Sequence, residues 1–343
     1  MRQYNPDRLC TGSDVLPKIR PPGFVVYESS TVMSSHPDPL LVRIGRACKR
    51  WAMTVLGAVF LPQLPPERLR DVAVAADRAG LEELWLWEDC FLEGGLAATT
   101  AALAWTERLR VGIGLLPIPL RNVAVTAMEI ATVQRLFPGR FHAGVGSGVP
   151  DWMVQVGAGV SSPLTLMREY VPALRSLLRG EDVSVEGKFV KLDRVRLDWP
   201  PSETVPILVG TGGPKGLALS GELADGTILT GGTTPDGVRH ARTQIDEGRA
   251  RAGRTDAHRV TVYVLAATGP GALARWEAEC RRWNLDPSDD VGVAGGAPAI
   301  AAAVERWADA GADTVVFQPT SDDPDPIRFI EFIAREVRPL VDA

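Results

Sequence analysis

The chain has 343 residues, of which 45% are hydrophobic and 23% charged, and its formal net charge is −5. This composition is that of an ordinary globular protein and excludes the disordered and fibrous classes. The sequence contains no basic stripe, so it lacks the electrostatic footprint of a nucleic-acid-binding protein.

Four cysteines, Cys10, Cys48, Cys90 and Cys280, lie far apart and form no C-x-x-C pair. This spacing argues against a disulfide framework or a zinc site and favours reduced thiols. No apolar run is long enough to span a bilayer, and the first residues lack the apolar core of a secretory signal. We therefore expect a cytoplasmic protein with no metal, no membrane association and no nucleic-acid partner.

Residues 1–52 differ from the rest of the chain. They contain six prolines, paired serines and no sustained apolar period. We predict an irregular, partly disordered N-terminal extension, followed by a single domain over residues 53–343. A start at Met53 would leave the pattern of that domain whole.

From Val55 onward, short β-rich runs alternate with helical stretches. Several runs are continuously apolar, as expected for parallel strands that are covered on both faces. The predicted strands are Val55–Phe60, Leu84–Trp87, Arg110–Leu115, Arg140–Val145, Val205–Gly210, Gly226–Thr230, Val260–Ala266 and Asp313–Gln318. Helices with apolar residues three and four apart are predicted over Pro66–Ala79, Thr126–Leu136, Leu164–Leu178, Pro214–Ala224, Pro235–Ala252 and Ile300–Ala310.

Eight strands with helical crossovers predict a (β/α)8 TIM barrel, because the count closes at eight with no strand left over. An open doubly wound sheet is the competing architecture. The segment Asp182–Leu197 has short β-rich runs on either side of Glu186-Gly187 and predicts a small hairpin insertion before strand five.

In a barrel of this kind the active site is built from loops at the carboxyl ends of the strands. Strand two leads into Glu88, Asp89 and Cys90, two adjacent carboxylates and a thiol that are suited to moving a proton or holding a cofactor edge. The alternative interpretation is helix capping or plain surface acidity. Strand three contains Gly112 and Gly114, which indicate either a ring system pressed against the backbone or tight packing inside the barrel.

Two further strand ends are rich in glycine. Strand four leads into Gly144–Gly148 and then Trp152, which leaves room for a large ligand beside a stacking surface. Strand five is followed by Gly210–Gly213 and Lys215 at the start of a helix, where unpaired N–H groups and the helix dipole favour a phosphate. Thr230 and Gly231 at the end of strand six lie beside it. The alternative is a loop without a ligand.

Other catalytic machinery is missing from the sequence. The four histidines form no H-x-H or H-E-x-x-H motif, and no G-x-S-x-G elbow or P-loop occurs. His142 lies within strand four and is interpreted as a structural histidine. Phosphate and ring binding without a catalytic set of its own suits a protein whose cofactor supplies the reactivity.

At these residues the sequence resembles the luciferase-like superfamily, especially its coenzyme F420-dependent branch of methylene-tetrahydromethanopterin reductases and F420-dependent glucose-6-phosphate dehydrogenases. The resemblance runs from about Met53 to the C-terminus. It is carried by Gly112–Asn122 with Met128–Thr132, Phe137–Phe141 into Gly144–Gly148, Ser162–Leu164 with Arg168–Tyr170, and Gly210–Pro214 with Ala224–Gly226.

The resemblance implies roles for particular positions. Asp89 matches the acid that approaches the deazaflavin ring, and Gly114–Leu115 matches a site where relatives hold a non-prolyl cis peptide behind the ring. Gly146, Ser147 and Gly148 match the loop beside the ring and tail. The cofactor phosphate and side chain are implied at Gly210, Thr211, Gly212, Gly213, Thr230 and Gly231.

The sequence departs from the sugar-phosphate dehydrogenases of that branch. Those enzymes carry a histidine after the strand-two acid, where this chain has Cys90, and a glutamate after the strand-four glycines, where it has Val149. Their lysine after strand six is also missing, because Thr233 and Thr234 follow Gly232. These differences argue against glucose-6-phosphate as the substrate.

The leading hypothesis is therefore an oxidoreductase that transfers hydride between an F420-type deazaflavin and a small organic substrate. Asp89 or Cys90 assists at the reacting face, and Glu88 and Asp151 are weaker candidates for proton transfer. One alternative is an FMN-dependent two-component monooxygenase, and another is a non-catalytic F420- or FMN-binding protein. Because relatives are commonly homodimers, a homodimer is expected.

Overall fold

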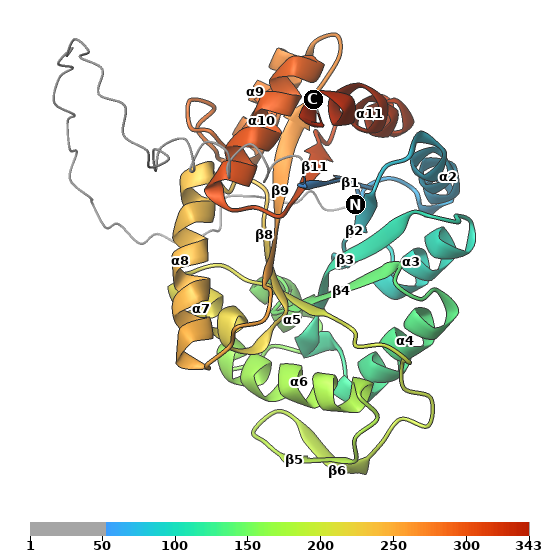
Figure 1. The fold of residues 1–343 in the computed structure, drawn as a ribbon, viewed down its shortest axis with the longest axis vertical. Helices are drawn as coiled ribbons and strands as arrows, with labels where there is room; N and C mark the ends of the chain where they lie inside the picture. The colour runs from blue at the N-terminus through green and yellow to red at the C-terminus, as the bar shows by residue number, and fades with distance from the viewer. Residues whose placement is uncertain (1–52, 343) are drawn as a thin grey trace, which may run out of the picture.

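A computed structural model describes residues 53–342, and the predicted N-terminal extension with Cys10 and Cys48 lies outside them. Eight parallel strands form the barrel (Figure 1), and it closes because β8 pairs with β9 and β11 pairs with β1. The strands are β1 Val55–Val59, β2 Glu83–Leu86, β3 Arg110–Pro117, β4 Phe141–Gly146, β7 Ile207–Gly210, β8 Gly226–Leu229, β9 Arg259–Ala267 and β11 Thr314–Pro319. The predicted TIM barrel is confirmed, and each predicted strand end lies within two residues of the observed one.

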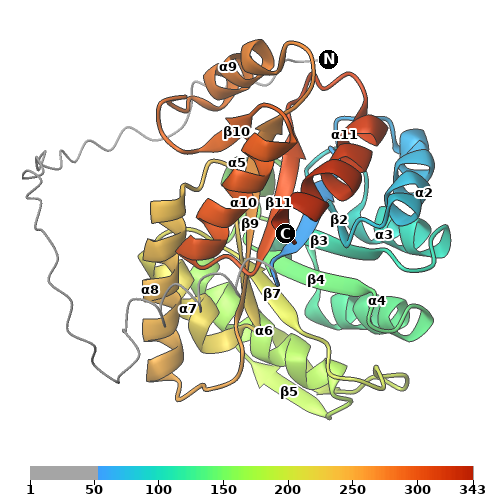
Figure 2. The ribbon, with the colours of Figure 1, turned by 45° about the horizontal axis from the view of Figure 1, so that its top comes forward.

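Helices surround this barrel on the outside (Figure 2). They are α2 Leu69–Ala79, α3 Gly95–Ala104, α4 Val123–Leu136, α5 Pro150–Gln155, α6 Pro163–Leu178, α7 Pro214–Leu223, α8 Pro235–Arg251, α9 Ala272–Trp283, α10 Ala297–Ala310, α11 Pro326–Phe332 and α12 Arg338–Val341. Short turns of 3-10 helix at Pro66–Arg68 and Ile118–Leu120 precede α2 and α4, and a π-helical turn at Ile333–Val337 joins α11 to α12. Every residue of β2, β7, β8 and β11 is buried, as expected when the barrel interior covers one face and the helices the other.

The predicted hairpin is present before β7, the fifth strand of the barrel. Its strands β5 Val183–Glu186 and β6 Lys191–Val195 pair antiparallel. Glu169 of α6 holds the turn, since its carboxylate accepts backbone hydrogen bonds of 2.8–3.0 Å from Lys188, Phe189 and Val190. The insertion is therefore anchored to α6, in the layer of helices around the barrel.

One strand was not predicted. β10, Gly292–Ala294, pairs only with β9 and adds a ninth strand to the sheet outside the closed barrel. The expectation that no strand would be left over is therefore wrong. The three residues Gly292–Ala294 show no β-rich run in the sequence. The Trp276 ring packs on this strand, 2.6 Å from where a Cβ of Gly292 would stand.

At the amino end of the barrel, Glu83 is fully buried and central to a polar cluster. It accepts hydrogen bonds of 2.7 and 2.6 Å from Arg259, lies 3.1 Å from His142 Nε2 and accepts a bond of 3.0 Å from the Trp85 indole. Burial alone would raise the pKa of Glu83, but the hydrogen bond from His142 and the charges of His142 and Arg259 hold it far below its usual range. His142 is thus part of the cluster at the end opposite the strand carboxyl ends.

No helix among residues 53–342 is both long enough and apolar enough to cross a membrane. The same part of the chain contains no group of three His, Cys, Asp or Glu side chains arranged to hold a metal ion.

Candidate functional site

The parallel strands bring the predicted site residues to one end of the barrel. All except Gly114 and Leu115 lie at or just beyond the carboxyl end of a strand, and in a closed parallel barrel these ends share one mouth. Asp89 and Cys90 follow β2, Gly114 and Leu115 lie in the second half of β3, Gly146 ends β4 before Ser147 and Gly148, Gly210 ends β7 before Thr211, Gly212 and Gly213, and Thr230 and Gly231 follow β8.

Glu88, the first acid after β2, is already engaged in the structure. Its Oε2 accepts a hydrogen bond of 2.8 Å from the backbone N–H of Gly95, at the start of α3. Both carboxylate oxygens also accept bonds from Arg121, which follows β3, at 2.7 and 2.5 Å. Glu88 is therefore a helix cap and an ion-pair partner, and it is not available for proton transfer.

Asp89 has a different environment. No residue in the described part of the chain donates a hydrogen bond to its carboxylate, and burial raises the pKa of Asp89 to about 6. The next residue, Cys90, has a thiol whose pKa is raised by burial and then by the negative charges of Asp89 and Glu88. The site therefore holds a weakly acidic carboxyl next to a neutral thiol.

Sequence reasoning missed Glu93, which belongs to the same loop. Both oxygens of its carboxylate are buried, and neither has a hydrogen-bond partner among the described residues. Burial, and then the charge of Asp89, raise the pKa of Glu93 to about 7. The only signal in the sequence is an acid four residues after Asp89 that directly precedes Gly94 and Gly95 at the start of a helix. This pattern is equally typical of a loop exposed to solvent.

The backbone of β3 lies against Tyr263 of β9. The Gly114–Leu115 peptide bond is cis, and the Tyr263 hydroxyl donates a hydrogen bond of 3.3 Å to the Gly114 carbonyl. A Cβ on Gly114 would stand 2.0 Å from that hydroxyl, and one on Gly112 would stand 2.6 Å from the Trp85 ring. Tight packing inside the barrel thus requires both glycines, which is the alternative that the sequence left open.

Leu115 takes the space beside two of the predicted glycines. A Cβ on Gly146 would lie 2.5 Å from a methyl group of Leu115, and one on Gly210 would lie 2.3 Å from the same methyl group. These glycines therefore make room for an apolar side chain between β3, β4 and β7. The expectation that Gly146 leaves open space for a ligand did not account for this packing.

The turn after β7 is open. No atom lies within 4 Å of where a Cβ would stand on Gly212 or Gly213, and Gly213 adopts φ +71°. No side chain caps the N-terminus of α7, which begins at Pro214. Its first N–H groups are thus available to an anion, and the exposed Lys215 adds positive charge in the first turn.

The end of β8 is more enclosed. The Thr230 carbonyl accepts a hydrogen bond of 2.7 Å from the Thr233 hydroxyl, and the position of a Cβ on Gly231 lies 2.8 Å from Gln318 Oε1. Gly231 therefore faces a side chain of β11 across the mouth.

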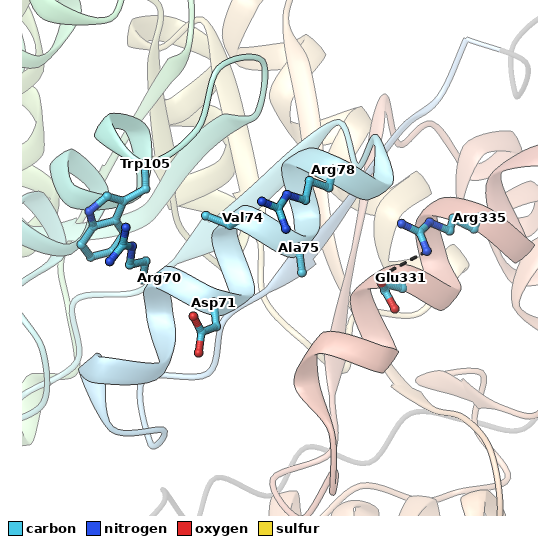
Figure 3. A pocket seen from close by; sticks show the side chains of 8 residues that line it. All are labelled: Arg70, Asp71, Val74, Ala75, Arg78, Trp105, Glu331 and Arg335. Carbon is cyan, nitrogen blue, oxygen red and sulfur yellow. Dashed lines mark ion pairs between the residues drawn. The ribbon is translucent and has the colours of Figure 1, made fainter.

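A separate groove of about 800 Å³ lies on the outer surface, between α2 and α11 (Figure 3). It has an ion pair of 3.3 Å between Glu331 and Arg335, and the guanidinium of Arg70 lies over the Trp105 ring at 6.0 Å. None of the predicted site residues lines this groove. It is a feature of the helical layer and does not open into the barrel.

Comparison with known proteins agrees with the geometry. Residues 50–320 match the model of the luciferase-like monooxygenase family. The chain is 31% identical over 199 residues to a 5,10-methylenetetrahydromethanopterin reductase of Methanolobus tindarius, covering 58% of this chain but only 60% of the reductase. It is 28% identical over 324 residues to an F420-dependent glucose-6-phosphate dehydrogenase of Kineococcus radiotolerans, covering 81% of this chain and 94% of that protein.

The fold has a solved counterpart in the coenzyme F420-dependent tetrahydromethanopterin reductase of Methanopyrus kandleri. The TM-score is 0.73 at 21% identity, over 84% of this chain and 99% of that one. This similarity supports the same barrel architecture. With the match of the family model over most of its length, the chain belongs to the luciferase-like monooxygenase family.

Proposed function

We propose that this protein is an oxidoreductase that transfers hydride between an F420-type deazaflavin and a small organic substrate. The observation that carries the proposal is the content of the barrel mouth. It combines an acidic loop after β2, the Gly114–Leu115 backbone supported by Tyr263, and the uncapped N-terminus of α7. The names of the relatives, an F420-dependent dehydrogenase among them, support the same cofactor.

We propose that the mouth holds a tricyclic ring with a phosphorylated tail, and the open turn after β7 supports the place of the tail. No atom lies within 4 Å of the Cβ positions of Gly212 and Gly213. The adjoining end of α7 offers N–H groups that can donate hydrogen bonds to a phosphate. We assign the phosphate and side chain of the cofactor to Gly210–Gly213 with Thr230 and Gly231. The ring is assigned to Gly114 and Leu115, with Gly146, Ser147 and Gly148 beside it.

When bound, the deazaflavin supplies or accepts the hydride. The residues of the chain would orient the reactants and move the proton. Asp89 and Cys90 are assigned to the reacting face, where the thiol stays neutral and can donate a hydrogen bond. Arg121 would hold this loop in place from the neighbouring strand end through its ion pair with Glu88.

The substrate is proposed to differ from glucose-6-phosphate, although four of the similar relatives act on it according to their names. Cys90 and Val149 stand where the dehydrogenases carry a histidine and a glutamate. A thiol and an isopropyl group cannot replace the imidazole or the carboxylate in acid–base catalysis at neutral pH. A substrate with less charge suits this mouth better.

Parallel titration of the purified protein with F420 and with FMN tests the proposal. We expect saturable binding of F420, seen as a change in its absorbance and fluorescence, with weaker binding of FMN. Tighter binding of FMN, together with oxygen consumption when reduced FMN and substrate are supplied, would support the monooxygenase alternative instead. A protein that binds neither cofactor would contradict the proposal.

We also propose a homodimer. The surface of α4 exposes three large apolar side chains, Val125, Met128 and Leu136, which are 50–61% exposed. Their spacing places them on one side of the helix, and an apolar stripe of this kind is typical of a surface that a partner covers. Sedimentation velocity of the wild type and of a Met128→Glu variant would test this.

A cytoplasmic location stays a prediction from the sequence.

A further inference from the structure

The interior of the barrel is marked by a cluster of buried side chains that is separate from the main core. Its members lie in β1, β2, β7, β8, β9 and β11 or directly follow them, and strands so far apart around the barrel can meet only inside it. They are Val59, Leu61, Trp85, Leu208, Ile228, Tyr263 and Val316. Because side chains alternate along a strand, Gln318, two residues after Val316 in β11, points into the interior as well.

Tyr263 shows how deep Gln318 lies inside the barrel. Its hydroxyl donates to the Gly114 carbonyl at 3.3 Å, so it bridges β9 to β3 on the opposite side of the barrel. In the register of β11 with β9, Tyr263 pairs with Val316. Gln318, the next interior residue of β11, pairs with Leu265. Gln318 therefore lies one interior layer nearer the carboxyl ends of the strands than this bridge, at the barrel mouth.

The carboxamide of Gln318 has no hydrogen-bond partner in the described part of the chain. Gln318 is only 2% exposed, and no residue between 53 and 342 donates to its oxygen or accepts from its nitrogen. By contrast, the carboxamide of Gln134, on α4, donates to the Phe141 carbonyl at 2.8 Å. A buried polar group without a partner lowers stability and calls for an explanation, and a place in a functional site is one.

Gly231, just beyond the end of β8, leaves this carboxamide uncovered. A Cβ on Gly231 would stand 2.8 Å from Gln318 Oε1, and an atom of Leu265 would be 3.7 Å away. A side chain at this position would therefore press on the amide oxygen. The missing side chain keeps a space in front of the carboxamide, and Leu265 gives that space an apolar neighbour.

Gln318 faces the proposed ring site across the mouth. In the closed order of the strands, β11 is opposite β4, and β9 is opposite β3. The ring is assigned to Gly114 and Leu115 of β3 with Gly146 at the end of β4, and the tail to the ends of β7 and β8. A substrate on the free face of the ring would therefore lie on the side of β9, β11 and β1, where the Gln318 carboxamide meets it.

We propose that Gln318 is a substrate-binding residue whose carboxamide N–H donates a hydrogen bond to the oxygen of a small, neutral carbonyl compound. This inference rests on the proposed function. In the reducing direction, the carbonyl carbon receives the hydride as a new C–H bond, and the electron pair of the C=O bond moves to the oxygen. The oxygen then takes a proton from water, and the reduced deazaflavin is oxidised in return. In the reverse direction, the carboxamide oxygen can accept the O–H of the alcohol.

The first experiment needs no cofactor and compares urea unfolding of the wild type, Gln318→Met and Gln134→Met. Methionine has nearly the shape of glutamine but carries no amide. We expect the urea midpoint of Gln318→Met to rise, because a buried amide without a partner is removed. Gln134→Met is the matched control, and its midpoint should fall because it loses a hydrogen bond of 2.8 Å. A Gln318→Met protein less stable than the wild type would show that the carboxamide has a structural role and would overturn the inference.

The second experiment follows the reduction of cyclohexanone by the protein loaded with reduced F420. We expect KM for cyclohexanone to rise about tenfold in Gln318→Met, as the loss of one buried hydrogen bond predicts, whereas Gln134→Met keeps the wild-type value. The Kd for F420 should be the same in all three proteins. For the wild type, 4-oxocyclohexanecarboxylate, which is the same ketone with a charge, should have a kcat/KM lower by about tenfold or more, because its carboxylate would lose water beside apolar side chains.

The outcomes separate this inference from the proposed function. If F420 and FMN both fail to bind, the proposed function is wrong. If F420 binds but the wild type does not reduce cyclohexanone, or Gln318→Met reduces it with the wild-type KM, only the assignment of Gln318 and its substrate is wrong. If Gln318→Met weakens the binding of F420 instead, the carboxamide holds the cofactor, and the inference is overturned.

Discussion

At the scale of single residues, the carboxyls of the β2 loop act on one another and on the thiol between them. Burial is the main cause that raises the pKa of Asp89 and of Glu93. The charge of Glu88, in contrast, is compensated by its ion pair with Arg121. Three acids within six residues therefore have different roles. The sequence alone shows only that they are close together, because the ion pair depends on a residue 33 positions away.

The thiol of Cys90 can report the charge of its neighbour. Because Asp89 helps to raise the pKa of that thiol, Asp89→Asn should lower it and speed alkylation by iodoacetamide at pH 8 by several-fold. The measurement is the pH dependence of the alkylation rate, read by mass spectrometry in a background with Cys10 and Cys48 replaced by serine. Cys280 is fully buried and serves as an internal control. Asp193→Asn, on the distant hairpin, should leave the rate unchanged; an equal rate in Asp89→Asn would show that the two groups do not interact.

At the scale of elements, the pattern of apolar residues predicted those strands and helices that bury one fixed face or both faces in the core. The eight barrel strands and the hairpin were found because apolar runs and turn residues are local properties. β10 was not found, because the three residues Gly292–Ala294 become a strand only by pairing with β9. The same limit applies to Gly146 and Gly210, whose role depends on where the side chain of Leu115 goes.

The N-terminus of α7 gives a prediction about the cofactor tail. Gly212→Asp fits without a steric clash, since nothing lies within 4 Å of the new Cβ, but it places a carboxylate where we assign the phosphate. We expect the Kd for F420 to rise about tenfold, equivalent to about 1.4 kcal/mol, because repulsion between the carboxylate and the phosphate replaces the attraction to the helix end. Fluorescence titration measures the change.

Gly296→Asp is the matched control for that variant. Gly296 is likewise an uncapped glycine at a helix start, before α10, and the nearest atom to its Cβ position is 3.9 Å away. Its effect on the Kd should be less than twofold. If both variants weaken the binding of F420 equally, or if neither variant weakens it, the cofactor tail is not bound at α7.

At the scale of the whole molecule, the two ends of the barrel are specialised differently. The amino end is closed by the Glu83 cluster, in which every charge has a partner, and the carboxyl end carries acids without partners. Because all eight barrel strands run parallel, the residues that the sequence singled out at strand ends meet at one mouth. The sequence did not single out Glu93, because the burial of its carboxylate is set by the assembled barrel.

The cluster at the amino end should control stability. Glu83→Ala removes the acceptor of a buried ion pair and is expected to cost about 3 kcal/mol of the free energy of unfolding, measured by urea denaturation. Because the pKa of Glu83 is depressed in the folded state, its contribution is present above the unfolded value of about 4.3 and is lost as pH falls below it. Glu203→Gln, at an exposed acid, should change neither quantity, and a Glu83→Ala protein as stable as the wild type would refute the assignment.

The central claim is that the carboxyl ends of the strands form the cofactor site. Hydrogen–deuterium exchange of the protein with and without F420 tests it most directly. We expect slower exchange in the segments 87–94, 114–118, 146–152 and 211–217, with no change in α2 and α11 around the outer groove. Protection confined to that groove, or no protection anywhere at saturating F420, would contradict the account.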